Sequence, residues 1–234
     1  MKRILYVVVA LTFVSCAELQ QVVNQLPQDI STIGNLDIAG GLRQALDLGI
    51  DKQVSKLTAK DGFFKNELVK IALPKELKKV DQGLRDIGLS KLADEGLKVL
   101  NRAAEDAVKE ATPIFVSAVK GITFDDAKNI LLGNDDAATQ YLSARTNAAL
   151  YEKFHPVIEN SFNKVGADEI WAKLINKYNA IPFTNKVNTD LTDYVTKKAL
   201  DGVYTMIAVE EKEIRTKVSS RTTDLLRQVF AIQD

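Results

Sequence analysis

The chain has 234 residues, with 31 basic and 31 acidic side chains, so its formal net charge at pH 7 is zero. A balanced charge gives no net field that would draw the protein to acidic lipid or nucleic acid, and no nucleic-acid partner is expected. A local basic patch stays possible, although no run of five or more like charges suggests one. One cysteine and one histidine exclude an internal disulfide and argue against a zinc site, which takes several such ligands. We therefore predict no metal and no other cofactor.

The N-terminus has the pattern of an export signal. Lys2 and Arg3 precede an almost wholly apolar stretch from Ile4 to Val14, which is shorter than the roughly 20 residues that span a bilayer. The stretch ends at Ser15 and Cys16, and residues 13–16 resemble a bacterial lipobox, in which the cysteine is lipidated and becomes the new N-terminus. The alternative is a plain signal peptide with an incidental cysteine. We expect residues 1–15 to be the signal and the lipid on Cys16 to anchor the chain to a membrane.

Residues 16–37 are predicted to be a tether. They are rich in Gln, Asn and Asp, and Pro27 and Gly34 interrupt any long helix. Such a solvated composition is typical of a linker that holds a domain away from a membrane. The location expected for the folded part is the periplasm-facing side of a bacterial envelope, at the outer membrane.

From residue 38 to residue 234 the apolar residues recur at helical spacing, which predicts one all-α, multi-helix globular domain. A first apolar stripe begins at Leu42, and Pro74 can open a second helix because proline is tolerated in a first turn. Residues 69–73 are a candidate for a short extended piece. A third stripe runs from Leu89 to Ala111, and Pro113 should bend or end that helix.

The second half of the domain has clearer helix boundaries. Thr123 with Asp126 three residues later is a capping-box pattern. Gly133 closes that helix, and Asn134 can cap the next one. Breaks at Gly166 and Pro182 precede a long helix from about Asp190 to Arg215, and a last helix begins near Thr222.

Five segments of the domain resemble the domain of unknown function 4197 family of bacterial envelope proteins. They are DGFFKNELVKIALPKELKKV (61–80), LNRAAEDAV (100–108), FDDAKNILLGNDDAATQYL (124–142), DLTDYVTKKALDGVYTMIAVEEKEIR (190–215) and RTTDLLRQVF (221–230). The resemblance covers nearly all of residues 38–232 and implies an export signal and a helical domain. It implies no activity.

Several charges lie where a helical register places apolar neighbours. Lys198 falls within one apolar face of the 190–215 helix and Glu210 at the edge of the other, whereas Glu211 and Arg215 share the polar side and are predicted to form a surface pair. Arg145 falls within an apolar stripe, and Arg221 precedes the last helix, where the dipole disfavours positive charge. Because a buried unpaired charge is very costly, we predict that these cations converge with carboxylates from other helices. The predicted cluster consists of Arg145, Lys198, Glu210, Arg221, Asp126 and Asp136.

Two interpretations of this cluster stay open. It can be an internal ion-pair network, or it can be a polar pocket for an anionic small molecule or a peptide carboxylate. Calcium binding by the acidic pairs 125–126 and 135–136 is not favoured, because the alternating oxygen ligands of a calcium loop are missing. His155 precedes Pro156 within a helical stretch and is interpreted as a side chain near a kink rather than as a catalytic base.

The leading hypothesis for function is a non-catalytic envelope lipoprotein whose helical domain binds a protein partner or a small ligand. An enzyme that acts on envelope material through a carboxylate pair is the second hypothesis, and it needs two carboxyl groups that face one cleft. A helical carrier of apolar molecules is the third, and it needs an open apolar cavity.

Overall fold

The structure is a computed structural model, which describes residues 35–73, 78–86, 88, 90–180, 182–183, 186–187 and 190–231. Within these residues the regular secondary structure is helical, with no strand, which confirms the all-α prediction. The α-helices are α2 (Asn35–Thr58), α3 (Lys78–Asp86), α4 (Ser90–Val108), α5 (Ala111–Lys120), α6 (Phe124–Leu131), α7 (Ala137–Asn163), α8 (Ala167–Asn179), α9 (Leu191–Thr216) and α10 (Asp224–Phe230). A short 3₁₀ helix, Val218–Ser220, separates the last two.

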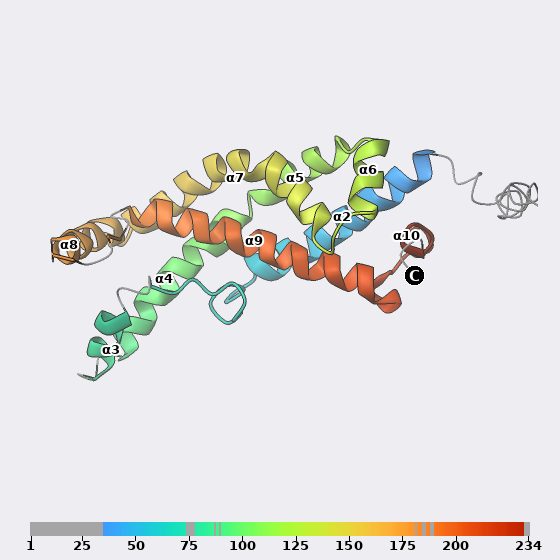
Figure 1. Cartoon of the computed structure of the whole chain (residues 1–234). Coiled ribbons are helices and arrows are strands. Elements are labelled where there is room, and N and C mark those ends of the chain that lie inside the picture. The colour runs from blue at the N-terminus through green and yellow to red at the C-terminus, as the bar shows by residue number, and fades with distance from the viewer. Residues whose placement is uncertain are drawn as a thin grey trace, which may run out of the picture.

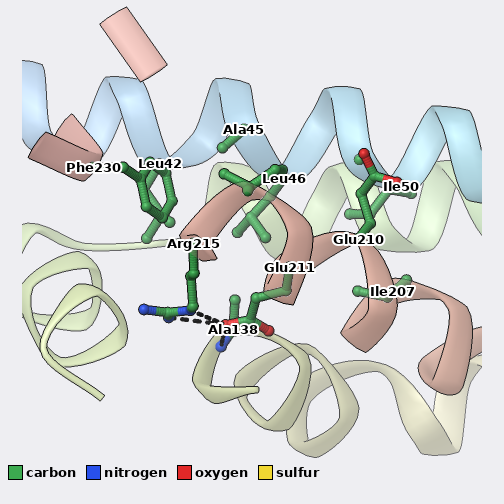
Figure 2. A pocket seen from close by; sticks show the side chains of 12 residues that line it. Leu42, Ala45, Leu46, Ile50, Ala138, Ile207, Glu210, Glu211, Arg215 and Phe230 are labelled. Atoms are coloured by element: carbon green, nitrogen blue, oxygen red, sulfur yellow. Dashed lines mark hydrogen bonds and ion pairs between the residues drawn. The ribbon is translucent and has the colours of Figure 1, made fainter. Parts of the chain in front are cut away.

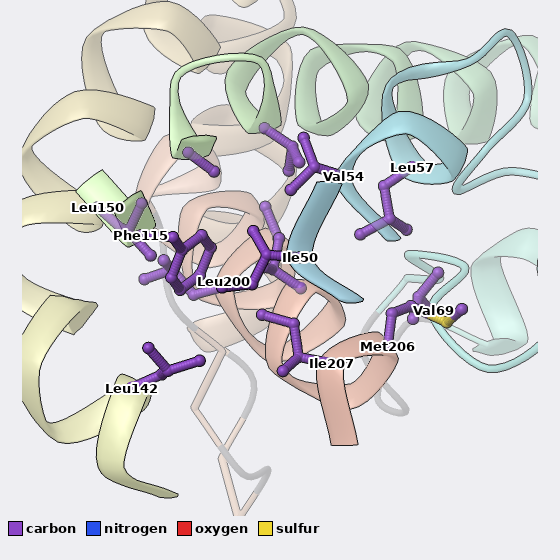
Figure 3. Close-up of a cluster of buried hydrophobic side chains, with 14 of the residues drawn as sticks. Ile50, Val54, Leu57, Val69, Phe115, Leu142, Leu150, Leu200, Met206 and Ile207 are labelled. Carbon is purple, nitrogen blue, oxygen red and sulfur yellow. The ribbon is translucent and has the colours of Figure 1, made fainter. Parts of the chain in front are cut away.

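The long helix α9 is the centre of the fold. It runs along the length of the molecule with α7 beside it, and α8 and α10 lie near its opposite ends (Figure 1). Its buried residues contact α2, α4 and α7, as expected of a helix with two apolar faces. Figure 3 shows the core that results, in which side chains from several helices and one loop meet. Those labelled there are Ile50, Val54, Leu57, Val69, Phe115, Leu142, Leu150, Leu200, Met206 and Ile207.

Local sequence signals explain several helix ends. Thr123 caps α6, and both capping-box bonds form, because its hydroxyl accepts from the Asp126 amide and the Asp126 carboxylate accepts from the Thr123 amide. Asp190 caps α9 by accepting from the Asp193 amide. Pro113 lies in the first turn of α5, so the chain breaks between α4 and α5 where the sequence predicted.

The start of α7 differs from the prediction. Its N-cap residue is Asp136 rather than Asn134, and the Asp136 side chain makes no capping bond. The first amides of this helix instead donate to a carboxylate of α9, which is described below. A cap supplied by a distant helix leaves no signal in the local sequence.

The connection that follows α2 is a compact series of turns anchored at both ends. Phe63 is fully buried, and Val69 is buried beside it. Both side chains pack on Gly202 of α9, where a side chain would meet them. Residues 70–73 follow and are held by Asn101 of α4, whose amide group accepts from the Ile71 amide at 2.8 Å and donates to the Ile71 carbonyl at 2.9 Å.

Some predictions lie outside the described residues. These are the export signal, the lipidation of Cys16, the tether up to residue 34 and the helix start at Pro74. Within the described part, no helix is both long and apolar enough to cross a membrane.

Candidate functional site

The structure does not bring the six predicted site residues together. Lys198 lies in solvent, with its side chain 47% exposed and its ammonium 3.1 Å from Asp201 on the same helix. The prediction that Lys198 is buried is therefore wrong. The surface stripe of α9 passes through Lys198, Asp201 and Thr205 and includes the exposed Val209, whose apolar side chain misled the assignment of the faces.

Arg145 and Asp126 are brought close, but at the surface. The guanidinium of Arg145 lies 3.9 Å from the Asp126 carboxylate, and its side chain is 55% exposed. Burial on α7 instead recurs every fourth residue, at Ala138, Leu142, Thr146 and Leu150, so Arg145 lies beside this stripe. Asp136 joins neither residue, and its carboxylate accepts from Gln140 one turn later at 3.0 Å.

Glu210 is buried as predicted, but its partners come from α2. Its carboxylate lies 2.5 Å from the Lys52 ammonium and accepts a hydrogen bond from the Gln53 amide. Removing a carboxylate from water is costly unless donors replace the water, and these two residues supply such donors. Glu210 therefore joins α9 to α2.

Arg221 is also buried, at 2% exposure, and its guanidinium lies at the C-terminal end of α9. Its Nε donates to the carbonyl of Ile214 and its Nη2 to that of Arg215, each at 3.0 Å. The last carbonyls of a helix carry a partial negative charge, so this end stabilises a cation. Backbone carbonyls of α9 thus accept from the Arg221 cation, and its ring contact is with Phe230, 5.9 Å from the guanidinium carbon.

The main buried ion pair joins Glu211 and Arg215, which lie 2.9 Å apart. The predicted pairing is confirmed, but the prediction that the pair lies at the surface is wrong, because both residues are buried. Glu211 accepts from the amides of Ala138 and Thr139 and from the Thr139 hydroxyl, each at 2.8 Å. Arg215 donates to the carbonyls of Ile130 and Leu131 at the end of α6. The pair thus connects α9 to the end of one helix and the start of the next.

A small cavity lies between these charged groups and the apolar side chains of α2. Figure 2 shows Glu210 pointing toward α2 and Glu211 pointing toward Ala138, so the two neighbouring carboxylates diverge. The cavity is walled by Leu42, Leu46, Ile50, Ile207 and Phe230 among others. Its internal volume of about 20 Å³ has room for about one water molecule.

The Arg145 cluster, consisting of Arg43, Asp126, Tyr141 and Arg145, is the more accessible polar group. The Arg145 guanidinium carbon lies 4.7 Å from the centre of the Tyr141 ring, and the Tyr141 hydroxyl lies 3.3 Å from Asp126. Arg43 donates to the carbonyl of Ile122, next to the Thr123 cap, so it lies at the same turn. In the described part of the chain Arg43 has no carboxylate partner, and its Nε is buried without an acceptor.

Asp126 is already engaged within this cluster. Hydrogen bonds from the backbone and the hydroxyl of Thr123 hold the pKa of its carboxyl below the usual value, and Tyr141 and Arg145 lower it further. Burial raises the pKa of Tyr141, as does the neighbouring Asp126 charge. The cluster thus contains two guanidinium groups and one engaged carboxylate, so it carries an excess of positive charge for an incoming anion.

The other polar candidates do not form a centre of this kind. The rings of His155 and Tyr151 lie 5.6 Å apart, and the Tyr151 hydroxyl donates to Asp193 at 2.7 Å, which raises the pKa of Tyr151 to about 12. Within the residues described, no hydroxyl or thiol nucleophile hydrogen-bonds to His155. Across the same residues, no three His, Cys, Asp or Glu side chains are grouped as metal ligands would be.

A family model described as "Protein of unknown function (DUF4197)" matches residues 32–231 of the chain. The chain belongs to this family. Neither the curated proteins nor the solved structures include a match. The match covers every helix described above and confirms the resemblance seen in the sequence, while the family's description assigns no chemistry.

Proposed function

We propose that this DUF4197 chain is an envelope lipoprotein, held at the periplasmic side of a bacterial membrane by a lipid on Cys16. Its helical domain is a non-catalytic module that binds an anionic group of a partner or ligand at the Arg145 cluster. The exposed, incompletely neutralised guanidinium of Arg145 above the Tyr141 ring is the observation that carries this proposal.

The chemistry of Arg145 suits recognition of carboxylates. A guanidinium offers several donors in a fixed plane and binds carboxylates in a bidentate manner. At 3.9 Å, Asp126 is too distant for a close hydrogen bond to Arg145, so the donors of Arg145 face water. The Tyr141 ring beneath the guanidinium limits its motion and thus the entropy that binding costs.

The buried carboxylates support a non-catalytic module over an enzyme. A carboxylate pair that acts on envelope material must face one cleft with free oxygens. Glu210 and Glu211 diverge, and each accepts from donors that hold helices together. The cavity between them has room for about one water, which also disfavours an apolar cargo at this place.

The lipid anchor is tested by metabolic labelling with a fatty acid in cells that express the full chain or its C16S variant. We expect the label and membrane attachment in the parent and neither in C16S. Label retained in C16S would overturn the lipoprotein part of the proposal.

Binding is tested by photo-crosslinking in cells from Ala148, which lies one turn beyond Arg145 and is exposed. We expect a discrete adduct that disappears when Arg145→Gln is added. The same photoreactive residue at the exposed Glu159 of α7 is the matched control. Equal adducts at both positions, or an adduct that survives Arg145→Gln, would contradict recognition at the Arg145 cluster.

A further inference from the structure

A second surface is formed by the turns that follow α2, together with one side chain of α4. We name it the Phe64 surface, and it consists of Phe64, Leu68, Lys70 and Lys98, with Lys60 and Lys65 at its edge. Leu68, four residues after Phe64, is 64% exposed. Figure 1 shows these turns, between α2 and α3, protruding from the helical body.

The turns hold this surface outward by a defined set of contacts. Phe63 and Val69 anchor the segment in the core, and the Phe63 amide donates to the buried Glu105 carboxylate at 3.2 Å. The Asn66 side chain accepts from the Leu68 amide at 3.1 Å, and the backbone amides of Val69 and Lys70 bond back to the Asn66 carbonyl. Because these contacts fix the turns on both sides of Leu68, the folded conformation itself keeps the Leu68 side chain exposed.

Two ammonium groups from distant parts of the chain meet at one aromatic ring. The Lys70 Nζ lies 4.7 Å from the centre of the Phe64 ring, and the Lys98 Nζ lies 5.6 Å from it. Neither lysine forms an ion pair within the described residues, whereas nearby Asp61 is engaged by Lys65 and Arg102. Glu67 and Glu95 are exposed acids in the same region, so the excess of positive charge is local and modest.

We infer that the Phe64 surface docks on the interface of an anionic phospholipid bilayer. Leu68 enters the boundary between headgroups and acyl chains, and Lys70 and Lys98 contact the phosphate groups. An exposed apolar side chain together with lysines is the chemistry by which peripheral segments bind such interfaces. The two lysines are far apart in the sequence, which is why no run of like charges indicated the surface.

The geometry of the chain permits this contact together with a lipid anchor. At 1.5 Å per residue, the 24 residues of α2 place the Phe64 surface about 36 Å from the start of that helix. A chain from Cys16 to Asn35 reaches about 60 Å when extended, so an anchored domain can lie with this surface on its membrane. The inference does not depend on the Arg145 cluster and stands or falls separately from the proposed function.

The test is sedimentation of the whole chain with lipid vesicles, using the C16S background so that no acyl chain contributes. Phosphatidylcholine vesicles with and without a quarter of phosphatidylglycerol are compared. We expect stronger partitioning into the anionic vesicles. The double variant K70Q/K98Q should lower that partitioning about 25-fold, at roughly fivefold per lysine. L68S should lower it about tenfold.

The matched controls are K153Q/K164Q, which changes two exposed lysines elsewhere, and L132S, which changes a leucine as exposed as Leu68; both should leave partitioning unchanged. Circular dichroism and the urea midpoint should stay at parental values in all variants, since none of these side chains is in the core. High salt should remove the effect of the lysines but keep that of Leu68. The inference is overturned if K70Q/K98Q and L68S partition into anionic vesicles as strongly as the parent or as the control variants.

Discussion

Arg215 donates two hydrogen bonds to the same oxygen of Glu211 one helical turn earlier, through Nε at 3.0 Å and Nη2 at 2.9 Å. The pair is buried, and both members also bind the backbone of other helices. Glu211 supplies the acceptor for the start of α7, and Arg215 supplies donors for the end of α6. The turn between α6 and α7 is therefore held by side chains from α9.

Removing either member should destabilise the domain strongly. Glu211→Ala and Arg215→Met each leave the other charge buried without its partner, so we expect a loss of about 3 to 5 kcal/mol in unfolding free energy. The double variant should lose less unfolding free energy than the sum of the two single losses, because it leaves no buried charge without its partner. Urea denaturation measures all three, with E213Q in the exposed Glu213–Lys217 pair as the control. A loss below about 1 kcal/mol for both single variants would refute the structural role of the pair.

Lys198 and Arg221 were both predicted to belong to the same buried cluster, but Lys198 is exposed and Arg221 is buried. Lys198→Met should change stability by no more than about 0.5 kcal/mol, because its pair with Asp201 is exposed. Arg221→Met should cost about 3 kcal/mol, since it removes the donors for carbonyls at the end of α9. Thermal and urea unfolding compare the two variants directly. Equal losses would mean that burial does not distinguish these residues.

These residues show how far the sequence could go. The helical periodicity of the apolar residues and the capping signals predicted α6, α9 and the break at Pro113, because residues close together in the sequence determine these features. The burial of Glu211 was not predictable, since its donors belong to residues 138 and 139 on another helix. The helical register alone showed two apolar faces on α9 but not that its third side is covered by the α6–α7 turn. Whether a polar side is covered depends on how helices pack, and one amphipathic pattern does not contain that information.

Two glycines with opposite surroundings test the packing of the core. A Cβ on Gly202 would lie 2.7 Å from Cε1 of the fully buried Phe63 and 3.3 Å from Val69. Gly202→Ala should therefore destabilise the domain by about 1 to 3 kcal/mol. At Gly96 of α4 a Cβ meets nothing within 4 Å, so Gly96→Ala should stabilise by about 0.5 to 1 kcal/mol through helix propensity. Urea unfolding of both variants should give opposite signs, and two losses of equal size would contradict the packing of Phe63 on α9.

The capping box of α6 should make part of the stability depend on pH. The pKa of Asp126 is lowered in the folded state, chiefly by the hydrogen bonds from Thr123. Because this pKa is depressed, the ionised carboxylate stabilises the fold fully at pH values above the pKa of the unfolded state, about 3.9. That stabilisation is lost as the pH falls through the pKa of the folded state.

Asp126→Asn should cost about 1 kcal/mol at pH 7, toward the lower part of the range for caps because the carboxylate is partly exposed. The difference between Asp126→Asn and the parent should narrow as pH falls below about 4, because the parent carboxyl then becomes protonated. Urea midpoints measured from pH 7 to pH 2.5 test this, with Asp125→Asn as the neighbouring control that makes no capping bond. If the difference in urea midpoint between the two proteins stays constant over this range, the negative charge of Asp126 does not contribute to stability. The capping box of α6 would then not depend on the ionised carboxylate.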